Sequence, residues 1–424
     1  MSLPRVLLGA GPETMDFAVH RRVHGDPPTA GRAAGAAARL HAELTRAGLR
    51  GRGGGAFPLA AKLAAAQRAK RRPVVVVNAT EGEPLSVKDR MLLESLPHLV
   101  LDGALCLADA LDTGEVIIAI DECFGDATAS MRRALLERPD LGGHTAQAKI
   151  VNVPSGYVTG QETAIVNFIN SGIPRPVTQP PRLTERGIAK RPTLMSNAET
   201  LAHVALIARH GAEWFREMGR EDEPGSALVT LSGGVRAPGV FEIEYGSRLG
   251  SVIEAAGGLT EPVRAFLFGG YAGSWVGGEA ARSARLSRAG LAPLRASLGA
   301  GIIVALPESA CPVAEVARVA AWMADESAHQ CGPCVNGLGS IADVLIDVCE
   351  GRGGRDAFGD IRRWSELVTG RGACAHPDGT ARFVTSALST FATEFDDHAR
   401  HGLCEACERR PVLIVPRRRV AVRS

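Results

Sequence analysis

Aromatic side chains, long apolar runs and an excess of one charge sign are all scarce in this chain of 424 residues. Aromatics make up 4% of it, so a large flat ligand would be held mostly by backbone and a few chosen rings. No apolar run reaches the ~18–20 residues needed to cross a bilayer, and the N-terminal apolar patch is too short for a secretory signal. The formal net charge is only +2, which gives no electrostatic reason for nucleic acid as a partner. These absences predict a soluble, cytoplasmic protein with no transmembrane segment.

Cysteine is unevenly distributed, which points to metal or redox chemistry. Of the nine cysteines, Cys106 and Cys123 come early and the other seven follow residue 310. Disulfides are unusual in the cytosol, so clustered thiols there more often hold a metal or a redox centre. Cys106, Cys311 and Cys349 lie in apolar segments and are expected to be core residues.

Periodicity divides the chain into five parts. Strand and helix patterns alternate in the first half, with apolar strands at 73–79, 116–120 and 148–153, which predicts an open α/β sheet with ligands at the carboxyl ends of its strands. Short strands with glycine turns follow, and then four helical stretches typical of an antiparallel bundle. The expected parts are a helical arm (1–45), an α/β domain (46–220), a small α+β module (225–308), a helical bundle (309–400) and a tail (401–424).

Glycines stand immediately before a predicted helix in the segment RGRGGGAFP, residues 50–58. Gly51, Gly53 and Gly54 would let the backbone approach a ligand, and Pro58 is suited to open the helix. The free N–H groups of a helix start favour an anion such as phosphate. A flexible turn is the alternative, because glycine-rich loops are common.

Three further segments carry polar residues where an α/β sheet usually binds ligands. Asn78, Glu81 and Glu83 follow the first strand; the carboxylates suit ring or sugar hydroxyls, or else simply face solvent. SGYVTGQETA places Tyr157 and Glu162 near a helix start. In RPTLMSNAET, Asn197 fits either ligand contact or the N-cap of the following helix.

Together the four segments resemble a known flavoprotein family. GLRGRGGGAFPLAAK, VNATEGEPLSVKDR, SGYVTGQETAI and SNAET are similar to GxRGRGGAGFP…K, VNADEGEPG…KDR, GAYICGEETAL and NNVET of the FMN- and NADH-binding flavoprotein subunit of bacterial respiratory complex I. Relatives of that subunit occur in soluble hydrogenases and formate dehydrogenases. The resemblance runs from about residue 45 to 400. It implies a Rossmann-like FMN-binding α/β domain, a β-grasp (ubiquitin-like, soluble-ligand-binding) module and a helical bundle that carries an iron–sulfur cluster.

The resemblance also implies the site residues. Those expected to hold FMN are Gly51, Gly53, Gly54, Lys62, Asn78, Glu81, Gly160, Ser196 and Asn197. Lys62 could reach the flavin phosphate or ring. Phe57, Glu83, Tyr157 and Glu162 would border the place where a nicotinamide stacks on the flavin, with the last three in the catalytic role.

Several positions depart from the family pattern. Thr80, Gln161 and Ser196 replace an Asp, a Glu and an Asn, and Ala65, Gln179 and Arg182 stand where the family has Phe, Lys and Phe. Most residues expected to surround the flavin are kept, whereas the aromatic contact expected to hold the adenine of the dinucleotide is lost. The expected electron donor is therefore NAD(P)H. Arg182 could read a 2′-phosphate or be plain surface charge.

The cysteines of the last third predict a metal centre. Cys331 and Cys334 form a CxxC, and Cys374 lies at a turn between helices. This spacing suits zinc or an iron–sulfur cluster; a thioredoxin-like pair is disfavoured because no βαβ unit flanks it. The resemblance implies a 4Fe–4S cluster, but Ala328 occupies the first ligand position. Cys404 is the preferred fourth ligand and His329 the alternative, with Cys407 spare, unless the tail thiols are simply free.

The predicted function is a soluble electron-transfer oxidoreductase. NAD(P)H would deliver electrons through FMN and the 4Fe–4S cluster to a ferredoxin or another iron–sulfur partner. One alternative is an electron-input subunit of a larger dehydrogenase or respiratory complex. Another is a non-catalytic nucleotide-binding scaffold.

Overall fold

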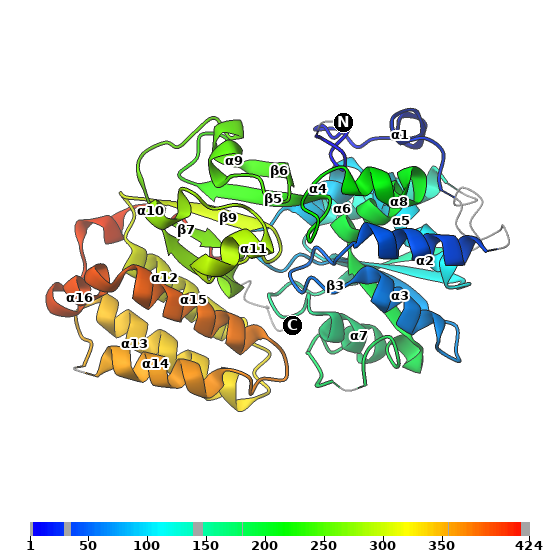
Figure 1. The fold of residues 1–424 in the computed structure, drawn as a ribbon. Coiled ribbons are helices and arrows are strands. Elements are labelled where there is room, and N and C mark those ends of the chain that lie inside the picture. Colours follow the sequence, from blue (N-terminus) through cyan, green and yellow to red (C-terminus); the bar gives the residue numbers. More distant parts are fainter. Residues whose placement is uncertain (1–2, 29–34, 139–146, 180, 355, 417–424) are drawn as a thin grey trace.

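A computed structural model describes residues 3–28, 35–138, 147–179, 181–354 and 356–416, and the end of the predicted tail (417–424) lies outside the described residues. The first half of the chain forms an α/β unit on one side of the molecule. The second half forms a five-stranded β-sheet above a group of helices on the other side (Figure 1). The predicted fold class is confirmed by this arrangement.

The first sheet is fully parallel and its strand order is β3-β2-β1-β4. Its strands are β1 (Val74–Ala79), β2 (Glu115–Asp121), β3 (Gln147–Val153) and β4 (Thr193–Asn197). β1 and β2 are almost continuous runs of buried apolar residues, as expected of strands covered on both faces. The chain moves outward from β1 to β2 and β3, then returns to add β4 on the other side of β1. A topological switch point therefore lies between the carboxyl ends of β1 and β4.

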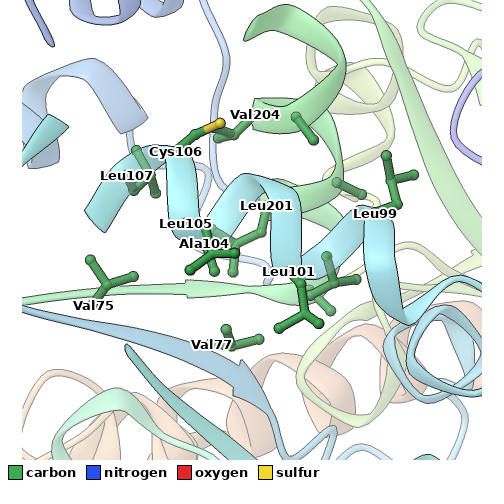
Figure 2. Close-up of a cluster of buried hydrophobic side chains, with 14 of the residues drawn as sticks. Val75, Val77, Leu99, Leu101, Ala104, Leu105, Cys106, Leu107, Leu201 and Val204 are labelled. Carbon is green, nitrogen blue, oxygen red and sulfur yellow. The ribbon is translucent and has the colours of Figure 1, made fainter. Parts of the chain in front are cut away.

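Helices cover both faces of this sheet. They are α1 (Phe17–His24), α2 (Ala36–Ala47), α3 (Leu59–Gln67), α4 (Lys88–Ser95), α5 (Pro97–Ala110), α6 (Gly125–Leu136), α7 (Glu162–Ser171) and α8 (Ala198–Arg216). Figure 2 shows α5 lying over Val75 and Val77 of β1 with Leu201 of α8 packed beside it. At this crossing a Cβ on Gly103 would lie 1.8 Å from the carbonyl oxygen of Leu201, so only glycine allows so close a contact between the two helices. α8 is thereby fixed against the sheet with its first turn at the switch point.

The second sheet belongs to the small α+β module and has the order β6-β5-β9-β7-β8. Its strands are β5 (Ser226–Gly233), β6 (Gly239–Glu244), β7 (Val263–Phe268), β8 (Ser274–Gly277) and β9 (Ile302–Pro307). β5 and β9 pair in parallel and the other pairs are antiparallel, with α9 (Leu249–Ala255) packed on the sheet through Leu249 and Val252. The short strand β8 was not expected from the sequence.

The last third is helical, with α12 (Pro312–Asp325), α13 (Gly339–Cys349), α14 (Ala357–Val368), α15 (His376–Thr390) and α16 (Ala392–His401). The expected fourth helix is in fact two, because the chain leaves helical geometry at Phe391. The Phe391 ring is buried with its centroid 5.2 Å from that of Trp275, so packing on the second sheet fixes the break.

Among the described residues, no single helix is long and apolar enough to cross a membrane. α4 and α5 meet the length and composition test only as a pair, across a 99° bend. Most of their residues are buried in the core.

Candidate flavin and iron–sulfur site

Two predicted flavin residues meet at the switch point. Asn78 lies near the carboxyl end of β1 and Asn197 ends β4, and the two are direct partners in the parallel register of these strands. The Asn197 side chain accepts a hydrogen bond from the N–H of Thr200, which confirms the expected N-cap of α8. The Asn78 amide donates to the carbonyl of Gly160 at 3.0 Å. These side chains join three of the four segments singled out in the sequence.

The loop after β1 and the loop before α7 pack backbone against backbone. A Cβ on Gly160 would lie 2.7 Å from Oγ1 of Thr80, and a Cβ on Gly82 would lie 2.6 Å from the carbonyl oxygen of Gly156. Thr80, which replaces the family's Asp, is buried and donates to Oδ1 of Asn78 at 2.8 Å. Thr80 therefore holds the Asn78 side chain in place and is itself covered by neighbouring residues.

Ligands of parallel sheets usually bind in the crevice outside the strand ends at the switch point, and the glycine-rich loop lies over this crevice from the side of α3. The N–H of Gly51 donates to the carbonyl of Phe57, and the loop ends at Pro58, which is the N-cap of α3. A Cβ on Gly53 would lie 3.7 Å from the Asn197 side chain, so this loop lies directly over the end of β4. Gly54 has φ = +98°, where a side chain would be strained. The Phe57 ring is half exposed beside this loop, and such a ring can stack on a flat ligand.

Lys62, which is expected to hold FMN, and Glu162, which is expected to border the nicotinamide, are brought together. Nζ of Lys62 donates to Oε1 of Glu162 at 2.7 Å and to the carbonyl of Met195 at 2.7 Å. The ammonium thus lies at the β4 end of the crevice, held by a backbone carbonyl and a partly exposed carboxylate.

The two glutamates of the β1 loop have different surroundings. Glu81 accepts hydrogen bonds from the N–H groups of Asp89 and Arg90, so its carboxylate caps the first turn of α4. Glu83 accepts from the N–H of Tyr271 at 2.8 Å and from the hydroxyl of Tyr157 at 3.3 Å. Burial raises the pKa of Glu83 to about 7 despite these donors. Simple solvent exposure, the alternative considered from the sequence, is wrong for both side chains.

Tyr157 joins the crevice to the helical bundle. Its ring centroid lies 5.7 Å from that of Trp322 on α12 and 5.3 Å from that of His376 at the start of α15. Its backbone N–H donates to Oε2 of Glu326 at 2.9 Å. His376 is two residues from Cys374, so one aromatic contact connects the flavin segments with the predicted metal centre.

Cys331, Cys334 and Cys374 lie close enough to affect one another electrostatically. Burial and then the neighbouring Cys331 raise the pKa of Cys334 to about 12, with Cys374 adding to the effect. The N–H of Cys334 donates to the carbonyl of Cys331, which folds the CxxC into a tight turn. The three thiols are therefore near neighbours.

The assignment of Cys404 to this group is corrected by the structure. Its sulfur belongs to a second group with Cys311, His398 and Cys407, whose ligand atoms all lie within 4.8 Å of one another. Gly402, at φ = +76°, turns the chain after α16 and directs Cys404 toward α12. Cys311 is buried as expected, but its sulfur is 3.3 Å from Nε2 of His398 and is not a purely apolar core group. Cys106 and Cys349 are buried, as predicted.

His329, the alternative fourth ligand, precedes Cys331 by two residues. It is exposed, has φ = +48°, and its Nε2 lies 3.2 Å from the carbonyl oxygen of Asp325. Among the other departures from the family pattern, Arg182 is exposed, as expected of surface charge, Gln161 is the N-cap of α7, and Ser196 is buried within β4.

A buried ion-pair network beneath the crevice was not anticipated. Nζ of Lys88 lies 2.8 Å from Oε2 of Glu199 and 3.1 Å from Oδ2 of Asp89, and Asp89 in turn accepts from the amide of Asn197 at 2.9 Å. Burial raises the pKa of Glu199, but Lys88, His203 and Arg52 together outweigh this effect and lower that pKa to about 2. Lys88 and Asp89 lie in the VKDR segment at residues 87–90, and their place in this motif is the sequence feature that could have indicated the network.

Comparison with known proteins agrees with this geometry. Residues 44–206 match the Nuo51 FMN-binding domain, residues 228–272 an SLBB domain, and residues 314–398 the NADH-ubiquinone oxidoreductase-F iron-sulfur binding region. An F-type subunit of NADH-quinone oxidoreductase of Rhizobium meliloti is 30% identical over 369 residues, which cover 84% of this chain and 87% of that protein. The corresponding protein of Escherichia coli is 29% identical over 372 residues, covering 84% and 83%.

A solved NAD+-reducing [NiFe]-hydrogenase in the H2-reduced state superposes with a TM-score of 0.78 at 27% identity. The match covers 85% of this chain, and this chain spans 63% of the hydrogenase chain. Motifs, sheet topology, cysteine placement and these similarities agree. The chain belongs to the family of F-type subunits of NADH-quinone oxidoreductase, and it is an NADH dehydrogenase-type oxidoreductase with binding regions for FMN and a 4Fe–4S cluster.

Proposed function

We propose that this chain is the electron-input subunit of a larger oxidoreductase, taking electrons from NADH and passing them to an iron–sulfur partner. The proposal rests on Asn78 and Asn197, which are partners in the register of β1 and β4 at the switch point. The glycine-rich loop lies over this pair, and Tyr157 connects the crevice to the helical bundle. The named relatives are subunits, which favours this function over the stand-alone ferredoxin reductase also considered from the sequence.

The crevice residues bind and orient FMN. Backbone N–H groups of the glycine-rich loop and the glycines at 51, 53, 54 and 160 let the ligand approach the main chain, and Lys62 supplies positive charge at the β4 end. Asn78 and Asn197 are held by neighbouring groups before any ligand arrives, which lowers the entropy cost of binding. When bound, FMN accepts an electron pair from a nicotinamide and releases electrons singly.

Phe57, Glu83, Tyr157 and Glu162 form the nicotinamide side. The Phe57 ring offers a stacking surface, and Tyr157 and Glu83 close the crevice toward the second sheet and exclude water. Glu83 titrates near pH 7, so it can hold or release a proton at its Oε2, where Tyr157 and Tyr271 meet.

Cys331, Cys334 and Cys374 supply three ligands of the 4Fe–4S cluster, and His329 is the remaining candidate from the sequence for the fourth. Imidazole ligates iron in some iron–sulfur proteins. The path from the crevice to Cys374 passes Tyr157 and His376. A ferredoxin acceptor, NADPH as a second donor and a cytoplasmic location stay predictions.

Anaerobic FMN binding by the purified chain tests the proposal. The Lys62→Ala variant should bind FMN at least several-fold more weakly, whereas Lys70→Ala, an exposed lysine just beyond α3, should bind like the wild type. Equal FMN affinity in all three proteins, or failure of the wild type to retain FMN, would overturn the assignment of this crevice.

A further inference from the structure

A second cluster of soft ligands lies away from the predicted iron–sulfur group. Cys311 is the N-cap of α12, His398 lies in the last turn of α16, and Cys404 and Cys407 follow in the tail. Their ligand atoms all lie within 4.8 Å of one another. Cys311, Cys404 and Cys407 lie outside the matched iron–sulfur region, which spans residues 314–398.

The spacing fits one tetrahedral ion. Zinc–thiolate bonds of about 2.3 Å at tetrahedral angles place two sulfurs about 3.8 Å apart. The Cys404 and Cys407 sulfurs are 3.6 Å apart, and the Cys311 sulfur is 3.3 Å from Nε2 of His398. A cubane cluster places a separate iron under each ligand and so needs its ligands farther apart than one ion does.

The second ring nitrogen of His398, Nδ1, fixes the orientation of the imidazole for metal binding. Its Nδ1 lies 2.9 Å from the backbone carbonyl of Cys349, a partner that accepts the Nδ1 proton and leaves Nε2 free to ligate. Metal-bound histidines usually have such a carbonyl or carboxylate partner. The His398 side chain is also buried, which restricts its rotation.

The backbone of the tail turns back toward the cluster of Cys311, His398, Cys404 and Cys407. Gly402 packs its Cα 2.8 Å from the position of a Cβ on Gly351, so the chain turns tightly at the end of α13. Beyond Cys407, the N–H groups of Val412 and Leu413 donate to the carboxylate of Glu315 on α12, and the Leu413 side chain is buried. A metal at the cysteines would fasten the first half of this segment, as Glu315 fastens the second.

We propose that Cys311, His398, Cys404 and Cys407 form a structural Cys3His zinc site that clamps the C-terminal segment onto the helical bundle. Four ligands close the coordination shell, which is typical of structural rather than catalytic zinc. Binding replaces the three thiol protons, which pass to solvent, with one divalent ion, and no electron is transferred. The site is independent of the proposed electron-input function.

Metal analysis of the full chain, with its iron–sulfur cluster intact, tests the site. The wild type should carry one zinc in addition to iron, and X-ray absorption at the zinc edge should fit three sulfurs and one nitrogen. Cys404→Ser and His398→Ala should lose the zinc and keep FMN and iron, whereas His398→Cys should retain zinc. The control Cys123→Ser changes an exposed thiol far along the chain and should leave zinc unchanged.

Limited proteolysis gives a second readout. Removal of zinc with a chelator should speed cleavage between residues 402 and 411 by at least tenfold without loss of flavin. Wild-type protein that contains no zinc and in which the three thiols of the site react freely would overturn the site. Loss of iron, rather than zinc, from Cys404→Ser would also overturn it and return Cys404 to the iron–sulfur cluster.

Discussion

Glu83 is a residue whose protonation depends strongly on its position in the fold. Burial raises its folded-state pKa from 4.5 to about 7, so the native protein holds this proton more tightly than the unfolded chain does. The resulting stabilisation is complete below pH 4.5 and is lost as the pH rises through about 7.

We therefore expect Glu83→Gln to flatten the pH dependence of the thermal midpoint between pH 4.5 and 7. Glutamine keeps the hydrogen-bond acceptor for Tyr271 and cannot ionise. Glu185→Gln, at an exposed position, is the matched control and should follow the wild type. Parallel curves for wild type and Glu83→Gln would refute the assignment of this titration to Glu83.

Ala328 is the residue that distinguishes this cluster shell from the family pattern. Ala328→Cys restores a fourth thiolate at the family position, and thiolate is the commoner iron ligand. We expect more iron retained per chain and an altered electron paramagnetic resonance spectrum of the reduced cluster, with zinc content unchanged. If His329 is the natural fourth ligand, His329→Ala should lose iron and the double variant with Ala328→Cys should recover it. No change in iron in any of these variants would contradict the proposed ligand set.

At the scale of elements, the loops on either side of the crevice depend on close backbone contact. Gly82→Ala would place a methyl group 2.6 Å from the Gly156 carbonyl oxygen, and relieving the clash must separate the two loops. We expect a loss of about 1–3 kcal/mol in stability and weaker FMN retention. Gly114→Ala, where the Cβ meets nothing within 4 Å, should change neither quantity. Normal FMN affinity in Gly82→Ala would indicate that the loops move without affecting the ligand.

α4, α8 and β5 are joined by the buried Lys88–Glu199 pair. Glu199 also accepts the N–H of Leu228 at 2.8 Å, so its charge ties the α/β unit to the second sheet. Lys88→Met removes the nearest partner of this buried carboxylate and leaves it only the more distant Arg52 and His203, so it should cost about 3–5 kcal/mol in a denaturant titration. Lys88→Met combined with Glu199→Gln also removes the carboxylate charge and should recover a large part of that loss. A double variant less stable than Lys88→Met alone would contradict this explanation.

Local sequence patterns predict most of the helices and strands. The predictions that are wrong concern features that depend on contacts between residues far apart in the sequence. The apolar strands β1, β2 and β3 carry a clear signal, whereas β4 is five residues long and follows Pro192, so its pairing with β1 was not visible in the sequence. The α15–α16 break depends on the Phe391–Trp275 contact across more than 100 residues. Cys404 was assigned to the wrong group because the turn at Gly402, not proximity in sequence, determines which thiols it meets.

At the scale of the whole molecule, the flavin crevice and the cysteine-bearing helices share one junction. The β1 loop, the 269–273 turn of the second sheet and the start of α15 all meet around Glu83, Tyr157 and His376. Because the second sheet contributes Tyr271 to this junction, all three parts of the chain are needed to place the crevice beside Cys374. We therefore expect the electron path to require the intact chain.

The proposed electron path is best tested by stepwise anaerobic titration with NADH, followed by flavin absorbance and by electron paramagnetic resonance of the same samples. For protein loaded with FMN and iron, we predict that flavin absorbance falls as NADH is added and that a reduced iron–sulfur signal grows with it. Unchanged flavin absorbance, or bleached flavin with a cluster that stays oxidised although dithionite can reduce it, would contradict electron flow from NADH through the flavin to the cluster.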